Sequence, residues 1–268
     1  HALIRRRRAT MSHNFIIAEH GVSIIFENAT PNDGTLIQSM DPFRVNDEPK
    51  NLLLKLFVTN DLQPISPEDT ELIRDIDPGN GMTLVDVLPS GGYQFHIRNV
   101  QGNLCCLLHT NKDFSICRCK LEGDFTMRNF GLNNALMLSY AFAGSFQQTL
   151  LIHASLVRHQ NKGYAFTAKS GTGKSTHVSL WLRYIPDCDL MNDDNPIVRV
   201  IDGKPYIYGS PWSGKTPCYR NIKAELGSIS RIDRAKENSV EQMRPIEAFA
   251  SLLPSCSTMK WDKAVFNN

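Results

Sequence analysis

Residues 164–176 read Tyr-Ala-Phe-Thr-Ala-Lys-Ser-Gly-Thr-Gly-Lys-Ser-Thr, and this stretch decides the fold of the second half of the chain. Its first four residues, 164–167, are aromatic, small or β-branched and predict a buried strand. The strand runs directly into the glycine-rich segment 168–176, a composition typical of a tight turn. Four apolar residues then follow at the i, i+3, i+4, i+7 spacing of a helix: Val178, Trp181, Leu182 and Ile185.

Strand, glycine-rich turn, Lys-Ser and helix are together the context of a Walker A phosphate-binding loop. Gly171 and Gly173 allow the backbone to turn sharply, so that successive N–H groups point toward phosphate oxygens. A helix from Lys174 adds the positive end of its dipole. Lys174 also brings a mobile charge to the β- and γ-phosphates, and Ser175 offers a hydroxyl to Mg²⁺. The residues expected to bind nucleotide are Ser170, Gly171, Thr172, Gly173, Lys174, Ser175 and Thr176.

One position departs from the usual Walker A pattern, because Ala168 stands where that pattern begins with glycine. Alanine is tolerated there if its φ is negative. The alternative interpretation is a coincidental Ser-Gly-Thr-Gly turn ahead of a helix. The flanking strand and helix favour the phosphate-binding loop over that coincidence.

Two adjacent carboxylates, Asp193 and Asp194, follow a short apolar segment and begin 19 residues after Lys174. A strand that ends at this pair would let the two carboxylates take different roles in phosphoryl transfer. One would hold the metal, while the other would orient or deprotonate the acceptor hydroxyl. The alternative is a solvated turn, since every residue of 192–196 is also common in turns.

His153 closes the apolar run 150–152, which predicts a strand ahead of the loop strand. A lone histidine beside an apolar run is more often structural than catalytic. From the residues alone, His153 is therefore only a secondary candidate for the site.

These residues together resemble the catalytic domain of the HPr kinase/phosphorylase family, part of the phosphoenolpyruvate carboxykinase-like group. The family's loop reads Gly-Asp-Ser-Gly-x-Gly-Lys-Ser, to which residues 168–175 are similar. The family's Asp-Asp pair matches residues 193–194, and its histidine stands fifteen positions ahead of the loop, as His153 does here. The resemblance covers residues 150–194 well and reaches more faintly to about residue 253.

The resemblance implies a central sheet with flanking helices and a set of roles for the matching residues. Lys174 and Ser175 would hold phosphate and Mg²⁺. Asp193 would act as the base toward the acceptor hydroxyl, and Asp194 would help to hold the metal. His153 would assist near the transferred phosphate.

The chain also departs from the family pattern after the carboxylates. The family's Glu-Ile-Arg-Gly segment, which supplies a further acidic metal contact, is absent, and Glu225 is the first acid beyond the nearest positions. Residues 209–215 instead resemble a segment of HPr-kinase-related proteins of unknown target and of kinases from peptide-modification gene clusters. HPr itself is therefore a doubtful substrate. Lys215 and Arg220 are the cations expected near the γ-phosphate or an anionic substrate, with an ordinary solvated loop as the alternative.

The N-terminal half has a different sequence pattern, with short apolar runs separated by turn residues between about 15 and 124. It predicts a mostly β domain over residues 11–128, arranged as an antiparallel meander or small barrel. A hairpin is expected where residues 15–17 and 22–26 flank Glu19-His20-Gly21. Helical spacing over 132–146 opens a phosphate-loop kinase domain assigned to residues 129–268. The predicted class is α/β (α+β).

Charge and cysteine usage limit the partners. The 29 basic and 27 acidic residues give a net charge of +2, but four of the basic residues are the run Arg5–Arg8. We expect residues 1–10 to be extraneous sequence before a native start at Met11, rather than an arm for nucleic acid or membrane. The seven cysteines match no zinc spacing and predict core thiols in a reducing, cytoplasmic compartment. Cys117 and Cys119 are expected to share one sheet face.

The sequence therefore predicts a cytoplasmic ATP- and Mg²⁺-dependent kinase that transfers the γ-phosphoryl group to a serine-like hydroxyl of a peptide, protein or small molecule. The acceptor stays open, as does assembly into a homo-oligomer. The main alternative is a regulator that binds ATP without transferring phosphate, and a carboxykinase is a third.

Overall fold

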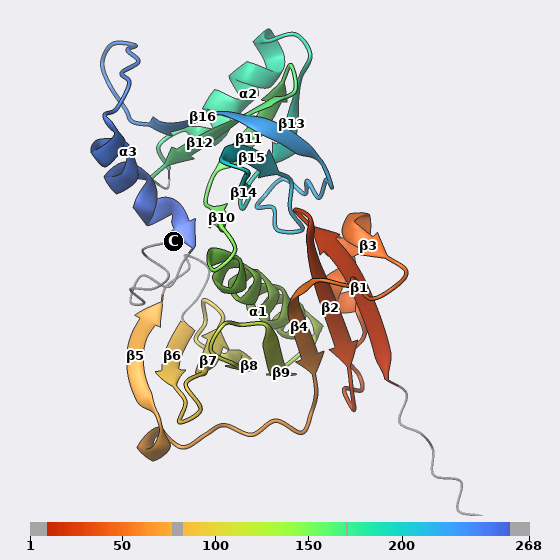
Figure 1. Ribbon diagram of the computed structural model, residues 1–268. Helices are drawn as coiled ribbons and strands as arrows, with labels where there is room; N and C mark the ends of the chain where they lie inside the picture. Colours follow the sequence, from red (N-terminus) through yellow and green to blue (C-terminus); the bar gives the residue numbers. More distant parts are fainter. Residues whose placement is uncertain (1–9, 77–82, 170, 258–268) are drawn as a thin grey trace, which may run out of the picture. The chain divides into compact units, whose positions relative to one another are not determined.

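The chain folds into two units, each built on its own mixed β-sheet (Figure 1). The computed structural model describes residues 10–76, 83–169 and 171–257. Internal contacts divide the chain into a first unit, His1–Ala143, and a second unit, Gly144–Asn268. Two large mixed sheets with few helices make the class mixed α/β, as the sequence predicts. Most of the expected N-terminal extension, residues 1–9, lies outside the described residues.

The first unit contains a nine-stranded sheet with the order β3-β1-β2-β4-β9-β8-β7-β6-β5. Its strands are β1 (Met11–Ile17), β2 (His20–Phe26), β3 (Arg44–Val45), β4 (Leu52–Val58), β5 (Glu71–Ile76), β6 (Thr83–Val87), β7 (Tyr93–Arg98), β8 (Leu104–Thr110) and β9 (Ile116–Leu121). Two 3₁₀ segments, Gly34–Phe43 and Pro67–Asp69, lie between strands. The predicted hairpin is confirmed, because β1 and β2 pair in antiparallel fashion. Its turn is Ala18-Glu19, both with positive φ, rather than Glu19-His20-Gly21, since His20 and Gly21 already belong to β2.

The predicted antiparallel meander is correct from β5 to β9 and wrong at β4. This strand lies between β2 and β9 and runs parallel to both. Parallel neighbours cannot be joined by a tight turn, so β4 reaches its place through longer connections. The sheet is therefore mixed. Cys117 and Cys119 are both buried on β9, which confirms that they share one face; burial raises the pKa of the Cys117 thiol.

Helix α1 (Phe125–Ser145) packs along the first sheet and belongs almost entirely to the first unit. The amides of Asn129 and Asn133 both donate to the carbonyl oxygen of Leu36. The buried Tyr140 hydroxyl donates to the carbonyl oxygen of Ile17 at 2.8 Å. These contacts place the division between the units near residue 143, whereas the sequence pattern suggested 128.

The second unit contains an eight-stranded sheet with the order β13-β11-β12-β16-β15-β14-β10-β17. Its elements are β10 (Thr149–Ile152), β11 (Ser155–His159), β12 (Lys162–Ala168), α2 (Lys174–Tyr184), β13 (Cys188–Asn192), β14 (Ile197–Ile201), β15 (Lys204–Tyr208), β16 (Lys223–Ile232), α3 (Pro245–Leu252), the 3₁₀ segment Leu253–Ser255 and β17 (Cys256–Ser257). Strands β12 and β16 pair in parallel, and the other described neighbours in this sheet are antiparallel.

Helix α2 covers one face of the second sheet. Phe166 on β12 lies 4.6 Å from the His177 ring and 5.3 Å from the Trp181 ring, measured between centroids, and Val178 is buried beside it. The predicted apolar stripe is wrong at its C-terminal end, because Leu182 is exposed and Ile185 lies just past the helix. The buried stripe is shorter than the sequence pattern suggested, since the helix stops after three turns. The opposite face carries the larger apolar cluster, which includes Ile152, Leu156 and Met191.

None of the helices in the described ranges combines the length and apolar character that crossing a bilayer requires.

The hydrogen bond between Tyr140 and Ile17 provides a test of how α1 is held on the first sheet. Tyr140→Phe removes the hydroxyl and leaves a buried carbonyl without this donor, so unfolding should become easier by about 1–2 kcal/mol. Urea unfolding followed by circular dichroism measures the change. Tyr184→Phe, at an exposed tyrosine of α2, is the matched control and should alter stability by less than about 0.5 kcal/mol. Equal effects from the two variants would show that the bond does not anchor α1.

Candidate functional site

The predicted phosphate-binding loop connects β12 to α2. Gly171 and Gly173 have φ values of +76° and +108°, in the left-handed region that favours glycine. The N–H of Thr172 donates to the carbonyl oxygen of Lys169 at 3.1 Å, which tightens the turn. Ser170 lies outside the described residues. The loop conformation thus depends on the two glycines that the sequence singled out.

Helix α2 begins at Lys174, directly after Gly173. Because Gly173 occupies the N-cap position, no capping side chain accepts from the first-turn N–H groups. Within the described residues, neither Lys174 nor Ser175 makes a side-chain hydrogen bond or ion pair. A helix start of this kind offers N–H groups and a positive dipole end to an anion.

Strand pairing places the other predicted residues at the sheet edge where the loop emerges. Strand β11 runs antiparallel to β12, with Ser155 opposite Phe166, so His153 precedes β11 near the C-terminal end of β12. Strand β13 runs antiparallel to β11, with Asn192 opposite Leu156, so the two aspartates follow β13 at the same level. The sheet therefore gathers the loop, the histidine and the carboxylate pair at one edge, although they lie far apart in sequence.

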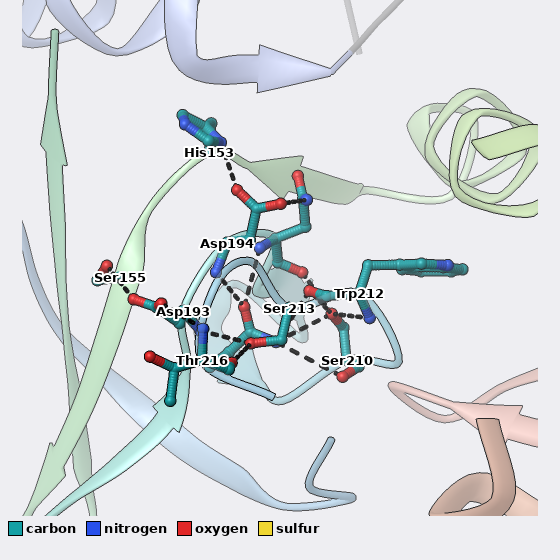
Figure 2. A network of polar contacts seen from close by, with 10 residues as sticks. His153, Ser155, Asp193, Asp194, Ser210, Trp212, Ser213 and Thr216 are labelled. Carbon is teal, nitrogen blue, oxygen red and sulfur yellow. Dashed lines mark hydrogen bonds and ion pairs between the residues drawn. The ribbon is translucent and has the colours of Figure 1, made fainter. Parts of the chain in front are cut away.

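Figure 2 shows the polar contacts of the two carboxylates. Oδ1 of Asp194 lies 2.9 Å from Nδ1 of His153, and its Oδ2 accepts from the amide of Asn195 at 2.9 Å. Oδ1 of Asp193 accepts from the Ser155 hydroxyl at 2.8 Å, and its Oδ2 faces the N–H of Thr216 at 3.4 Å. The pairing of His153 with Asp194 was not foreseen from the sequence, and neither was the contribution of Ser155.

Asn192 organises the turn that carries both carboxylates. Its side chain is fully buried, and its Oδ1 accepts from the N–H groups of Asp194 and Asn195, both at 2.8 Å. Its Nδ2 donates to the Ser210 hydroxyl at 3.2 Å and to the carbonyl oxygen of Trp212 at 3.1 Å. The sequence pattern assigned Asn192 no role of its own in the site. A buried strand end that carries an amide is the signal that could have identified it.

The segment 210–216 closes over the carboxylate turn. The buried Ser210 hydroxyl donates to the carbonyl oxygen of Asn195 at 2.6 Å and accepts from the N–H of Trp212 at 3.1 Å. The Ser213 hydroxyl faces the N–H of Asp193 at 3.3 Å. Lys215 is exposed in this segment, one residue from the N–H that faces Asp193. Lys215 therefore neighbours, in sequence, a residue whose N–H faces Asp193.

Arg220, the second predicted cation, is engaged elsewhere. It donates to Oδ2 of Asp189 at 3.0 Å and to the carbonyl oxygen of Leu190 at 2.7 Å. Arg158 binds the same carboxylate through two further bonds. Burial opposes ionisation of Asp189, but the hydrogen bonds from Arg158 and Arg220 prevail and hold its pKa below the usual value. Arg220 thus attaches its loop to β13 through Asp189 and Leu190.

The oxygen-rich donor set suits Mg²⁺ better than a softer metal. Mg²⁺ is commonly held by one or two carboxylates together with substrate phosphates and waters, rather than by a complete protein cage. Asp194 and Ser175 supply a carboxylate and a hydroxyl of that type. No group of three His, Cys, Asp or Glu side chains gathers for a metal within residues 10–76, 83–169 and 171–257.

Comparison with protein-family models finds no family that matches the chain, and comparison with curated proteins finds no match.

The Asn192 network makes a prediction about stability. Asn192→Ala deletes five hydrogen bonds and leaves buried N–H groups at Asp194 and Asn195 without their acceptor, so the second unit should lose about 2–4 kcal/mol. Denaturant unfolding followed by tryptophan fluorescence reports this loss. Asn238→Ala, at an exposed asparagine, serves as the matched control and should be nearly neutral. A change at Asn192 no larger than that at Asn238 would contradict the organising role.

Proposed function

We propose that the second unit is a phosphotransferase, which binds ATP with Mg²⁺ and moves the γ-phosphoryl group to a hydroxyl. The observation that carries the proposal is the meeting of a Walker A sequence, a carboxylate pair and a histidine at one sheet edge. A coincidental glycine-rich turn would have no reason to share its edge with the residues that phosphoryl transfer needs.

Each residue has a task that follows from its chemistry. Backbone N–H groups of the loop and of the first turn of α2 would bind phosphate oxygens, with Lys174 adding a positive charge. Ser175 and Asp194 would hold Mg²⁺, which offsets the charge of the β- and γ-phosphates. His153 would orient Asp194 through the 2.9 Å contact between them.

Asp193 would serve as the base. It would accept the acceptor's hydroxyl proton as the new O–P bond forms and the bond from the γ-phosphorus to the bridging oxygen breaks, releasing ADP. The Ser155 hydroxyl and the N–H of Thr216 orient this carboxylate. One carboxylate next to the oriented hydroxyl of the acceptor is sufficient for catalysis, because phosphoryl transfer depends mainly on positioning and charge neutralisation.

The position of Glu225 favours a second candidate function, a regulator that binds ATP without transferring phosphate. Glu225 was the nearest substitute for the absent acid of the Glu-Ile-Arg-Gly segment. It pairs with Lys204 at 2.5 Å and stands opposite Lys162, at the end of β12 remote from the loop. The hydrogen bond from Lys204 lowers the pKa of Glu225. The carboxylate pair and His153 argue for the enzyme, since binding alone requires neither.

Incubation with γ-labelled ATP and Mg²⁺ separates the two functions. Release of labelled phosphate to water, or its transfer to serine-containing peptides, is expected for the kinase. ATP binding without either product would establish the regulator instead.

The first prediction for this site concerns nucleotide affinity. Lys174→Ala removes the mobile charge from the loop and should weaken ATP binding at least tenfold, or about 1.4 kcal/mol. Isothermal titration calorimetry measures the affinity. Lys162→Ala is the matched control, because Lys162 is exposed at the opposite end of the same strand. Unchanged binding by the Lys174 variant would remove the loop from the nucleotide site.

The second prediction concerns chemistry. Asp193→Asn keeps the shape of the side chain and deletes its charge, so phosphoryl transfer should fall by roughly 10²–10⁴-fold, while the affinity for ATP in the presence of Mg²⁺ changes little. Asp194→Asn should instead raise the Mg²⁺ concentration needed for half-maximal rate. Transfer is followed first with water as acceptor.

Asp202→Asn removes one charge from an exposed turn of the same unit and should behave as the wild type. Wild-type turnover in the Asp193 variant would end its assignment as the base.

A further inference from the structure

The segment after β16 reaches the phosphate-binding loop. Strands β12 and β16 run parallel with Ala168 opposite Ile232, so the chain leaves both strands at the same sheet edge. Two residues beyond β16, Nη2 of Arg234 donates a hydrogen bond to the carbonyl oxygen of Gly171 at 2.6 Å. A guanidinium group therefore touches the loop from a position 63 residues further along the chain. Sequence analysis did not single out this arginine.

The charge of Arg234 is not neutralised by any residue in the described part of the chain. Its hydrogen-bond partner is a neutral carbonyl oxygen, and the side chain is exposed. Arg231, at the end of the same strand, differs, because it pairs with Asp233 at 3.4 Å and donates to Ser251 at 3.4 Å. Of these two arginines, only Arg234 both contacts the loop and has a positive charge that no described carboxylate pairs with.

A carbonyl oxygen is a weaker partner for guanidinium than a phosphate oxygen. Hydrogen bonds between ionised partners are roughly twice as strong as neutral ones, and the planar fork of arginine matches two phosphate oxygens at once. Guanidinium offers five N–H donors, so Arg234 can retain Gly171 while it binds an anion. Because this guanidinium contacts the loop itself at Gly171, a polyphosphate held by the loop would lie within reach of Arg234.

We propose that Arg234 is a further phosphate-binding residue, which contacts the β- and γ-phosphates of the nucleotide from the side of β16. This inference rests on the proposed function. It assigns the selectivity for a polyphosphate over a monophosphate partly to Arg234, since a nucleoside monophosphate has no charge at the β- and γ-positions.

The test compares ATP, ADP and AMP as ligands in isothermal titration calorimetry. Arg234→Ala should weaken ATP binding at least tenfold and leave AMP binding within twofold of the wild type. Arg234→Lys keeps the charge but not the planar fork, so its ATP affinity should lie between those of the wild type and Arg234→Ala. Arg231→Ala is the matched control and should bind all three ligands as the wild type does. Millimolar guanidinium should restore part of the ATP affinity of Arg234→Ala.

Each other outcome contradicts the proposal in a recognisable way. ATP binding by Arg234→Ala that equals the control would overturn the role of Arg234 while the proposed kinase stands. An equal loss for ATP, ADP and AMP would mean that the bond to Gly171 only shapes the loop. If the wild type binds none of the three ligands, the proposed function fails together with this inference. Unchanged melting temperatures of the variants would exclude unfolding as the cause.

Discussion

The buried amide of Asn192 is the constraint on which the candidate site depends. An amide removed from water must find partners for both its oxygen and its nitrogen, because each unsatisfied polar group costs about 1–3 kcal/mol. Asn192 meets this requirement with the N–H groups of Asp194 and Asn195 on one side and with Ser210 and Trp212 on the other. The carboxylate turn and the segment 210–216 are thereby joined through the protein core. The two carboxylates are thus held in place by buried bonds, which a solvated turn could not provide.

Sequence analysis predicted the parts of the site that are local in sequence. The loop 168–176 was recognisable because its strand, glycines and helix are contiguous. The functions of Asn192 and Arg220 were not, since their partners lie 18–20 and 31 residues away. Arg220 illustrates this limit. From the sequence alone, an arginine close to a phosphate-binding loop is a candidate anion ligand, and only the fold shows that it binds Asp189. Local chemistry identifies candidates, but the partner that engages each candidate comes from the fold.

The first unit illustrates the same limit at the level of strands. Apolar runs and turn residues were enough to place the β1–β2 hairpin and the strands β6 to β9, but they did not indicate β5. They gave no sign that β4 would pair in parallel with β9, because Lys55 and its partner Ile116 are separated by most of the sheet's sequence. A continuous apolar strand can pair with a parallel or an antiparallel neighbour, so the hydrophobic pattern does not determine its partner.

Electrostatics connects the carboxylate pair to the choice between enzyme and regulator. A triphosphate that binds at the loop brings several negative charges to the sheet edge that also carries Asp193 and Asp194. At separations near 4 Å, each like-charge contact would oppose binding by about 1–4 kcal/mol, depending on the local dielectric. A protein that only bound ATP would gain by replacing both aspartates with neutral residues. The two carboxylates become favourable once a divalent cation lies between them and the phosphates, or once a proton must be accepted from a hydroxyl. Their buried support by Asn192 therefore favours metal-dependent phosphoryl transfer over simple binding.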